Sequence, residues 1–301
     1  MTGAIADVLS EHGPLTGAEL LERTGTEPLA LWRSCLTNPE VESRIVGRRY
    51  LRLDRAVDGY ARLSPSIRRE FLTYTLLDRR NSGSRLDERA LKLTEDIIKI
   101  SDYKRRLATQ TIASIVDGLP GRDLIKEQCC FILAGDITYG MAHKVPRPEH
   151  STGKMVRGSD LDVIVVSADS MDPGLRAELD DAIYQKKYWL LVSPSYREEL
   201  DYLIKDMHAV EQQVEFDTFE HMVACKILVE GECLNGSSEI MTDIKRLLAE
   251  RGIPERLRLL EQNAAVHREH AVSTLREEGA ESDGAQYLNL FYTSDESDEI
   301  Y

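Results

Sequence analysis

Apolar residues recur at helical spacing over the first fifty positions, in three short clusters. A capping box at Thr16 and Glu19 begins the second cluster, and the third covers residues 28–37. Two extended runs follow, at residues 44–46 and 50–53, on either side of one glycine and two arginines. We therefore expect three short helices and a small basic hairpin.

Longer patterns follow this region. Residues 64–77 carry apolar residues and arginines at helical spacing and predict a further helix, whereas residues 81–84 (Asn-Ser-Gly-Ser) have the composition of a linker. Residues 86–117 then present one broad apolar face with a helical period. This stretch predicts a single long helix.

Beyond the long helix the spacing changes to that of buried strands. Residues 129–134 and 161–166 are short, almost wholly apolar runs, and each predicts a buried strand. Residues 214–219 alternate apolar and acidic positions and predict a third strand. Residues 173–206 predict two helices, and residues 221–277 predict helices that are interrupted at glycine, asparagine and proline.

Together these elements predict an α+β protein with a small mixed sheet flanked by helices. The three helices and the hairpin resemble a winged helix-turn-helix module, which we expect over residues 1–80. The core with the sheet is expected over residues 81–220, a helical C-terminal region over 221–278, and an acidic tail over 279–301.

The charge of the chain limits its partners. It carries 38 basic and 52 acidic side chains, a formal net charge of −14, and a field of that sign repels nucleic acid. Any DNA contact must therefore be local. Residues 43–80 contain ten arginines against four acids, and Arg48, Arg49 and Arg52 lie in the expected hairpin. The winged-helix region is thus the expected place for a contact with DNA or with a protein partner.

Composition also indicates a compartment. No apolar stretch reaches the roughly 18 residues of a membrane span, and the first residues lack the basic and apolar segments of a signal peptide. The five cysteines are scattered, odd in number and form no Cys-x-x-Cys pair, which is typical of a reducing environment. We therefore expect a cytoplasmic protein without a membrane partner.

Glycines and acids lie where the first two strands end and begin. Gly135 and Gly140 enclose a turn after the first strand, and Ser159 precedes Asp160 and Asp162 at the start of the second. Alternation along a strand places the two aspartates on one face, where their carboxylates suit Mg²⁺, with Mn²⁺ as the alternative. The glycine turn lets backbone N–H groups approach phosphates closely.

The third expected strand carries Glu215 and Asp217 on one face. Either acid completes a set of three carboxylates, and a bound cation would relieve the repulsion among them. His221, just beyond this strand, is a minor candidate for the same site.

An apolar strand, a glycine turn, an Asp-x-Asp strand and a later acidic strand together resemble the nucleotidyltransferase superfamily typified by DNA polymerase beta. The resemblance covers roughly residues 86–260. Its most specific part is residues 159–166, Ser-Asp-Leu-Asp-Val-Ile-Val-Val. It implies a nucleotidyltransferase fold for the core expected over residues 81–220.

The resemblance also implies an activity. The protein would use Mg²⁺ to transfer a nucleotidyl group from an NTP, with ATP the expected donor, to a hydroxyl acceptor and release pyrophosphate. Asp160, Asp162 and Asp217 would be catalytic and metal-binding, with Glu215 as an alternative ligand. The implied nucleotide-binding positions are Gly135, Asp136, Gly140 and Ser159.

Two features depart from the family pattern. Asp136 stands where the family has a serine that contacts phosphate. An insertion at residues 143–157 is basic and contains proline. The cations that it offers to phosphates in place of that serine are Lys144, Arg147, Lys154 and Arg157.

Two other functions are compatible with the sequence. One is a non-catalytic regulator or antitoxin-like protein that binds its partner through the winged helix, and the other is a transcription regulator whose nucleotidyltransferase fold senses a ligand. Asp136 favours these binding functions, whereas the set Asp160, Asp162 and Asp217 favours the enzyme. The acceptor stays open among a small antibiotic, a protein hydroxyl, an RNA 3′ end and a second nucleotide.

Overall fold

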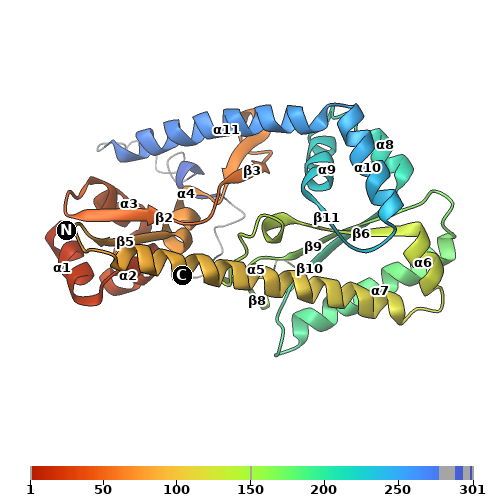
Figure 1. Cartoon of the computed structure of the whole chain (residues 1–301), viewed down its shortest axis with the longest axis horizontal. Helices are drawn as coiled ribbons and strands as arrows, with labels where there is room; N and C mark the ends of the chain where they lie inside the picture. The colour runs from red at the N-terminus through yellow and green to blue at the C-terminus, as the bar shows by residue number, and fades with distance from the viewer. Residues whose placement is uncertain (1, 150, 278–288, 294–298, 300–301) are drawn as a thin grey trace. The chain divides into compact units, whose positions relative to one another are not determined.

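The computed structural model describes residues 2–149, 151–277, 289–293 and 299 (Figure 1). It contains 57% helix and 18% strand, with the strands in small sheets, so the expected α+β class is confirmed. Contacts within the chain divide it into two compact units. The first comprises Met1–Arg52, Ala61–Ile98 and Glu261–Tyr301, and the second comprises Leu53–Tyr60 and Lys99–Leu260.

The first unit begins with three helices, as expected: α1 Thr2–His12, α2 Gly17–Thr24 and α3 Pro28–Thr37. The capping box that begins α2 is formed. Thr16 Oγ1 accepts the backbone N–H of Glu19 at 3.2 Å, and the Glu19 carboxylate accepts the backbone N–H of Thr16 at 2.7 Å. Two N–H groups at the helix start are thereby satisfied.

A three-stranded antiparallel sheet in the order β1-β5-β2 completes this part of the unit. Its strands are β1 Leu15–Thr16, β5 Thr75–Arg79 and β2 Val41–Ile45. The prediction that residues 44–46 and 50–53 form a hairpin is wrong. β2 pairs with β5 instead, and β3 Tyr50–Leu53 pairs with β4 Ala61–Ser64.

The prediction of a helix over residues 64–77 is also wrong. Only α4 Ile67–Arg69 and a π-helical turn, Glu70–Tyr74, precede β5. The first four residues of β5 are all buried, because β5 is the central strand of its sheet. A run that is apolar at successive positions fits a helix and a central strand equally well, so the pattern alone did not separate them.

The core of the first unit takes side chains from both ends of the chain. Leu9 and Leu275 are fully buried in one cluster. Trp32 in the same cluster packs against Phe291, with ring centroids 5.8 Å apart. Most of the expected acidic tail, residues 279–301, lies outside the described residues.

The second unit is built on a four-stranded mixed sheet in the order β10-β9-β6-β11. β9 and β10 run parallel, whereas β6 runs antiparallel to both β9 and β11. The strands expected at residues 129–134 and 161–166 are confirmed. The four strands are β6 Cys129–Ala134, β9 Leu161–Ser167, β10 Leu200–Asp206 and β11 Glu232–Gly236. β11 lies within residues 221–277, where only helices were expected, so that expectation is wrong at residues 232–236: this segment pairs with β6.

Helices cover both faces of this sheet (Figure 1). α5 Arg85–Asp117 and α7 Pro173–Val192 share one apolar core with alternate residues of β6, β9 and β10, while α9 Phe219–Glu230 and α10 Ser238–Glu250 pack on β6. The chain also forms α6 Arg122–Gln128, α8 Met207–Gln213 and α11 Ile253–Arg276. None of the described helices is long and apolar enough to cross a membrane.

Two expectations within residues 173–219 are wrong. Residues 200–206 form the strand β10 rather than a second helix, and residues 214–219 form a turn into α9 rather than a strand. Val214 and Phe216 are buried in this turn, so apolar and acidic positions alternate there without any strand. Phe216 has a φ of +57°, which is incompatible with extended backbone.

Candidate metal centre

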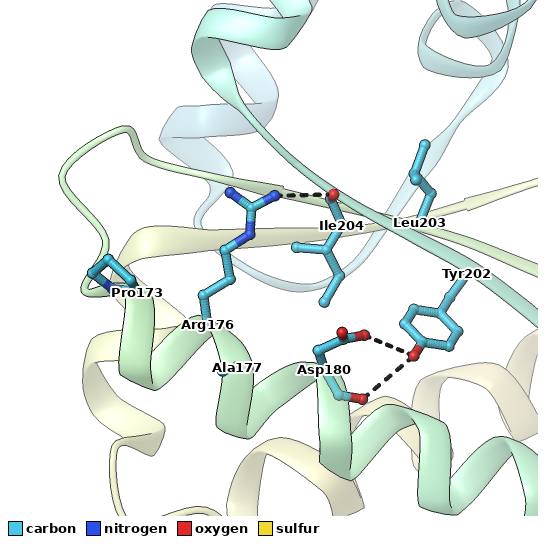
Figure 2. A pocket seen from close by; sticks show the side chains of 7 residues that line it. All are labelled: Pro173, Arg176, Ala177, Asp180, Tyr202, Leu203 and Ile204. Carbon is cyan, nitrogen blue, oxygen red and sulfur yellow. Dashed lines mark hydrogen bonds between the residues drawn. The ribbon is translucent and has the colours of Figure 1, made fainter.

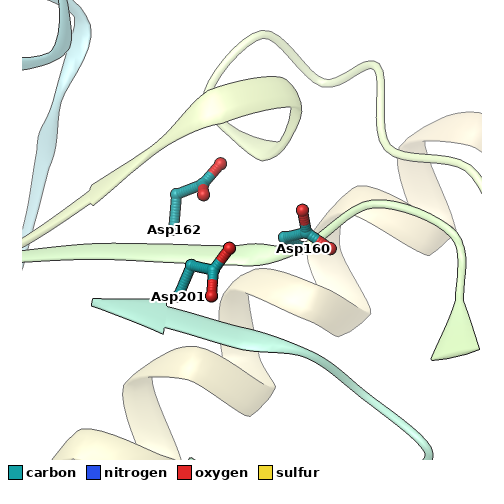
Figure 3. Close-up of side chains that lie close together, drawn as sticks. All are labelled: Asp160, Asp162 and Asp201. Atoms are coloured by element: carbon teal, nitrogen blue, oxygen red, sulfur yellow. The ribbon is translucent and has the colours of Figure 1, made fainter. Parts of the chain in front are cut away.

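Three aspartates lie together at one end of the β9–β10 pair (Figure 3). Asp160 immediately precedes β9, Asp162 lies in β9, and Asp201 is the register partner of Asp162 in β10. One carboxylate oxygen from each lies within 4.8 Å of the others, and all three side chains are half-buried. The strands are parallel, so their first residues meet at the same end of the sheet.

A glycine turn reaches these aspartates from β6. Ala134, the last residue of β6, is the register partner of Asp162, so the turn starts beside that carboxylate. Gly135 has a φ of +75°, and a Cβ at this position would lie 2.1 Å from Asp162 Oδ2. Only glycine satisfies both the backbone conformation and the close approach.

Asp136 and Ser159 lie in the same region. Ser159 Oγ donates to Asp136 Oδ2 at 3.2 Å and accepts the backbone N–H of His143 at 3.1 Å. Gly140 ends the turn, with its N–H bonded to Ile137 O at 3.1 Å and open space where a Cβ would lie. The expected nucleotide-binding positions therefore belong to one turn and to the segment that enters β9.

A carboxylate accepts hydrogen bonds from this glycine turn. Glu230, the last residue of α9, accepts the Gly135 N–H at 3.4 Å and the Tyr139 hydroxyl at 2.5 Å. Glu230 also forms an ion pair with Lys226, whose ammonium lies 5.3 Å from the centroid of the Tyr139 ring. The turn thus presents its donors to an anionic group.

Asp217 and Glu215 do not reach the aspartates. Asp217 lies in the turn before α9, with Oδ1 2.7 Å from Nδ1 of His221, and Glu215 forms an ion pair with Arg251 at 2.9 Å. Both acids are exposed. Neither joins the carboxylate group because the strand that was expected to carry them does not form.

Asp201 takes the third place instead, and the sequence did not single it out. It lies between Leu200 and Tyr202, so it has the same apolar–acidic–apolar pattern as Glu215. The surrounding residues were expected to be helical. β10 is an edge strand, and its Leu203 is 52% exposed, so the alternation that identifies a strand is weak here.

The basic insertion at residues 143–157 forms a hairpin of β7 Pro146–Pro148 and β8 Met155–Arg157. Arg147 in β7 forms an ion pair with Asp160 and a second one with Glu199 at 2.8 Å. The guanidinium is 16% exposed and the Glu199 side chain 7%, so these contacts are sheltered from water. Burial raises the pKa of Glu199, and the charge of Arg147 opposes that change.

Glu149 holds the turn of this hairpin, and its side chain is buried. The carboxylate accepts hydrogen bonds from the N–H and hydroxyl groups of Ser151 and Thr152, at 2.5 to 3.0 Å. Burial alone would raise the pKa of Glu149, but these hydrogen bonds outweigh it and lower the pKa to about 2. The hairpin that carries Arg147 is therefore fixed at its turn.

A buried lysine fixes the backbone just before Asp160. The Lys104 side chain in α5 is 1% exposed. Its ammonium donates to Ser159 O at 2.6 Å, Arg157 O at 2.8 Å and Glu198 Oε2 at 2.5 Å, which uses all three of its N–H donors. Burial lowers the pKa of Lys104 and raises that of Glu198, and their attraction opposes both changes.

Two cations partly balance the three aspartates. Lys187 of α7 lies 2.7 Å from Asp201 Oδ1, and Arg147 pairs with Asp160. A donor set made only of carboxylate oxygens suits a hard divalent cation such as Mg²⁺ or Mn²⁺ and not Zn²⁺, which prefers histidine and cysteine. A cation at this centre would compete with Arg147 for Asp160.

A pocket of about 570 Å³ lies between α7 and β10 (Figure 2). Its polar groups bond to one another: Arg176 donates to Ile204 O at 3.1 Å, and the Tyr202 hydroxyl donates to Asp180 Oδ1 at 2.7 Å. Successive residues of a strand point to opposite faces, so Tyr202 and Asp201 point away from each other. This pocket is therefore distinct from the candidate metal centre.

No protein-family profile and no curated protein sequence matches the chain. The chemistry of the centre follows from its own residues. They offer three carboxylates to a divalent cation and, beside them, the Gly135 N–H, which donates to the carboxylate of Glu230.

Replacing Lys104 by methionine should destabilise the protein, because Glu198 would stay buried without its partner. We expect a loss of about 3–5 kcal/mol in the free energy of unfolding, measured by urea denaturation. The double variant Lys104→Met/Glu198→Leu should recover part of this loss, since no lone charge remains. An unchanged stability in the single variant would contradict the role given to Lys104.

The Glu149 turn should give a defined pH dependence. The pKa of Glu149 is depressed in the folded protein, so its contribution to stability is present above its ordinary pKa of 4.5 and is lost as the pH falls towards 2. The wild type should therefore be more stable than Glu149→Gln above pH 5, and this difference should shrink between pH 4.5 and 2. Denaturation of both proteins across that range measures it, and a difference independent of pH would refute it.

Proposed function

We propose that the protein is a divalent-metal-dependent nucleotidyltransferase, with Asp160, Asp162 and Asp201 as its metal ligands. The observation that carries the proposal is the grouping of these three carboxylates against the Gly135 turn. An Asp-x-Asp strand, a third acid on the adjacent strand and a glycine turn are what transfer of a nucleotidyl group requires: cation ligands beside donors to phosphate.

In this proposal, different residues bind the metal ion and orient the nucleotide. Asp160 and Asp162 hold Mg²⁺ or Mn²⁺, which when bound supplies charge stabilisation for a triphosphate and activation of a hydroxyl. Asp201 completes the ligand set. The Gly135 N–H and the Tyr139 hydroxyl, which donate to Glu230, would orient the phosphates of the NTP, with ATP the expected donor.

Arg147 places a positive charge beside the Asp160 carboxylate. When a cation takes that carboxylate, the guanidinium is still tethered by Glu199 and is placed to contact a phosphate oxygen. In this proposal Arg147 replaces the family serine for which Asp136 stands, because Asp136 already accepts a hydrogen bond from Ser159.

The N-terminal region supports a winged-helix proposal. Three helices and a sheet in the order β1-β5-β2, with β1 between α1 and α2, are compatible with that module. Arg49 forms a bidentate ion pair with the buried Glu70 at 2.5 and 2.7 Å, so its role is internal. A contact with DNA or a protein would use other arginines of residues 43–80.

A non-catalytic binding protein is the second candidate, and one observation favours it. Asp136 and Glu230 place two carboxylates beside the Gly135 turn, which a triphosphate would have to displace or avoid. A protein that binds a partner through its N-terminal region without using this site would tolerate both. The metal-binding variants below separate the two candidates.

Asp201→Asn should weaken Mn²⁺ binding at least roughly tenfold, because the centre loses one of its three charged ligands. Asp217→Asn should leave the affinity unchanged, because this acid bonds to His221 outside the centre. Calorimetric titration of Mn²⁺, alone and with each NTP, measures both. Loss of binding in Asp217→Asn and not in Asp201→Asn would show that the third ligand has been misassigned, and no binding by the wild type would reject the enzyme.

Arg147→Ala should raise the affinity for Mn²⁺ roughly fivefold, because the cation no longer displaces a guanidinium worth about 1 kcal/mol from Asp160. The same variant should weaken NTP binding in the presence of the metal. Arg122→Ala, an exposed arginine of α6 at the opposite end of β6, is the control and should change neither. Equal Mn²⁺ affinities in wild type and Arg147→Ala would exclude this competition.

A further inference from the structure

Aromatic side chains and lysines share one surface beside the candidate metal centre. The aromatic rings lie in α5, at the C-terminal end of α7 and in the loop that follows it. We call this set the aromatic strip, and its rings are Tyr103, Tyr188, Trp189 and Tyr196. The lysines at its rings are Lys144, Lys154 and Lys186.

Two of the rings contact each other, and two of the lysines lie over ring faces. Trp189 and Tyr196 have centroids 5.0 Å apart at an interplanar angle of 50°. The Lys186 ammonium lies 4.3 Å from the centroid of Trp189, and that of Lys154 lies 5.5 Å from the centroid of Tyr188. The surface therefore combines flat apolar faces with positive charge.

Tyr103 extends the strip from α5. Lys144 lies 6.0 Å from the centroid of its ring. The pKa of Tyr103 is raised, first by burial and then by the charges of Glu198 and Tyr196. Tyr103 thus adds a further ring with a lysine beside it.

The strip borders the three aspartates through two elements. Lys187, next to Tyr188 in α7, reaches Asp201 at 2.7 Å. Lys154 lies at the turn of the hairpin whose other strand carries Arg147, the residue that pairs with Asp160. A chain bound along the rings would therefore end near the carboxylates.

The exposure of these rings is not required by the fold. Trp189 is 43% exposed and Tyr188 56%, whereas Leu179, Ile183 and Leu190 on the core face of α7 are fully buried. Lysine is depleted at the centre of protein–protein interfaces, and three lysines at exposed rings do not suit such an interface. Rings for stacking with lysines for phosphates are the arrangement that binds unpaired nucleotides.

We propose that the aromatic strip binds a single-stranded oligonucleotide, with bases stacked on Trp189, Tyr188 and Tyr196 and phosphates beside Lys154 and Lys186. The inference rests on the proposed nucleotidyltransferase function in one respect: the bound strand presents its terminal hydroxyl to the three aspartates as the acceptor. The net charge of −14 opposes a polyanion, so binding depends on these local contacts and weakens with salt.

The test is fluorescence anisotropy of a fluorescein-labelled strand of about ten nucleotides, as RNA and as DNA, with the full chain at about 50 mM salt. EDTA is present, so that binding does not depend on a metal. Trp189→Ala and Tyr188→Ala should each weaken binding roughly tenfold, and Trp189→Phe should keep most of it. Lys154→Ala and Lys186→Ala should each lower the slope of log affinity against log salt by about one.

Matched controls lie elsewhere on the surface. Tyr60, which is 41% exposed and packs on Phe219, and Lys92, an exposed lysine of α5, should both be replaceable by alanine without effect. Absence of binding overturns the proposal. So does equal binding by Trp189→Ala, or equal binding of a duplex or an inorganic polyphosphate of the same charge.

The two proposals fail separately. Asp160→Ala/Asp162→Ala should bind the oligonucleotide in EDTA at least as tightly as the wild type does, because the strip is intact and two negative charges near the end of the strand are removed. Oligonucleotide binding by a protein that takes up no Mn²⁺ would support the strip and reject the enzyme. Mn²⁺ uptake without oligonucleotide binding would reject the strip and leave the enzyme in place.

Discussion

The buried ammonium of Lys104 is the constraint on which the geometry of the candidate metal centre depends. It lies in α5, yet it bonds to the backbone before β9 and to a carboxylate before β10. Those two segments carry Asp160 and lead directly into Asp201. A lysine without water needs every donor satisfied, so the two strand entries are held in one relative position. The carboxylates can then approach each other within 4.8 Å although their charges repel.

That repulsion explains the cations around the centre. Arg147 is held by a hairpin whose turn is fixed by Glu149, and Lys187 reaches across from α7. Both are internal counter-ions for a group of acids that suits a divalent cation. At the Gly135 turn, Glu230 accepts hydrogen bonds from the Gly135 N–H and the Tyr139 hydroxyl, and a phosphate could also accept them. Arg147 and Lys187 therefore take the place of a bound cation at the aspartates, and Glu230 takes the place of a phosphate at the Gly135 turn. In the proposed function, a metal ion and a nucleotide would have to displace these side chains.

The sequence predicted those parts of the fold whose patterns are complete within one segment. The long apolar face of α5, the buried runs of β6 and β9 and the capping box of α2 were confirmed because each is specified locally. It failed for β5, β10, β11 and residues 214–219, where the outcome depends on distant pairing. The sequence pattern of β5 also fits a helix, and only its pairing with β1 and β2 makes it a strand. β10 lies at the edge of its sheet, where one side of the strand is unpaired. Asp160 and Asp162 could therefore be found from the sequence, whereas Asp201 required the register of β10 against β9.

In the proposed function, Asp160, Asp162 and Asp201 together bind a divalent cation beside a nucleotide. The most direct measurement is a crystal structure of the full chain soaked with Mn²⁺ and a non-hydrolysable ATP analogue, with Mn²⁺ located by its anomalous scattering. We expect an anomalous peak at about 2.0–2.3 Å from oxygens of all three carboxylates, with the phosphates against the Gly135 turn and Arg147 moved off Asp160. Well-ordered carboxylates without a peak between them, with Arg147 still on Asp160, would contradict it.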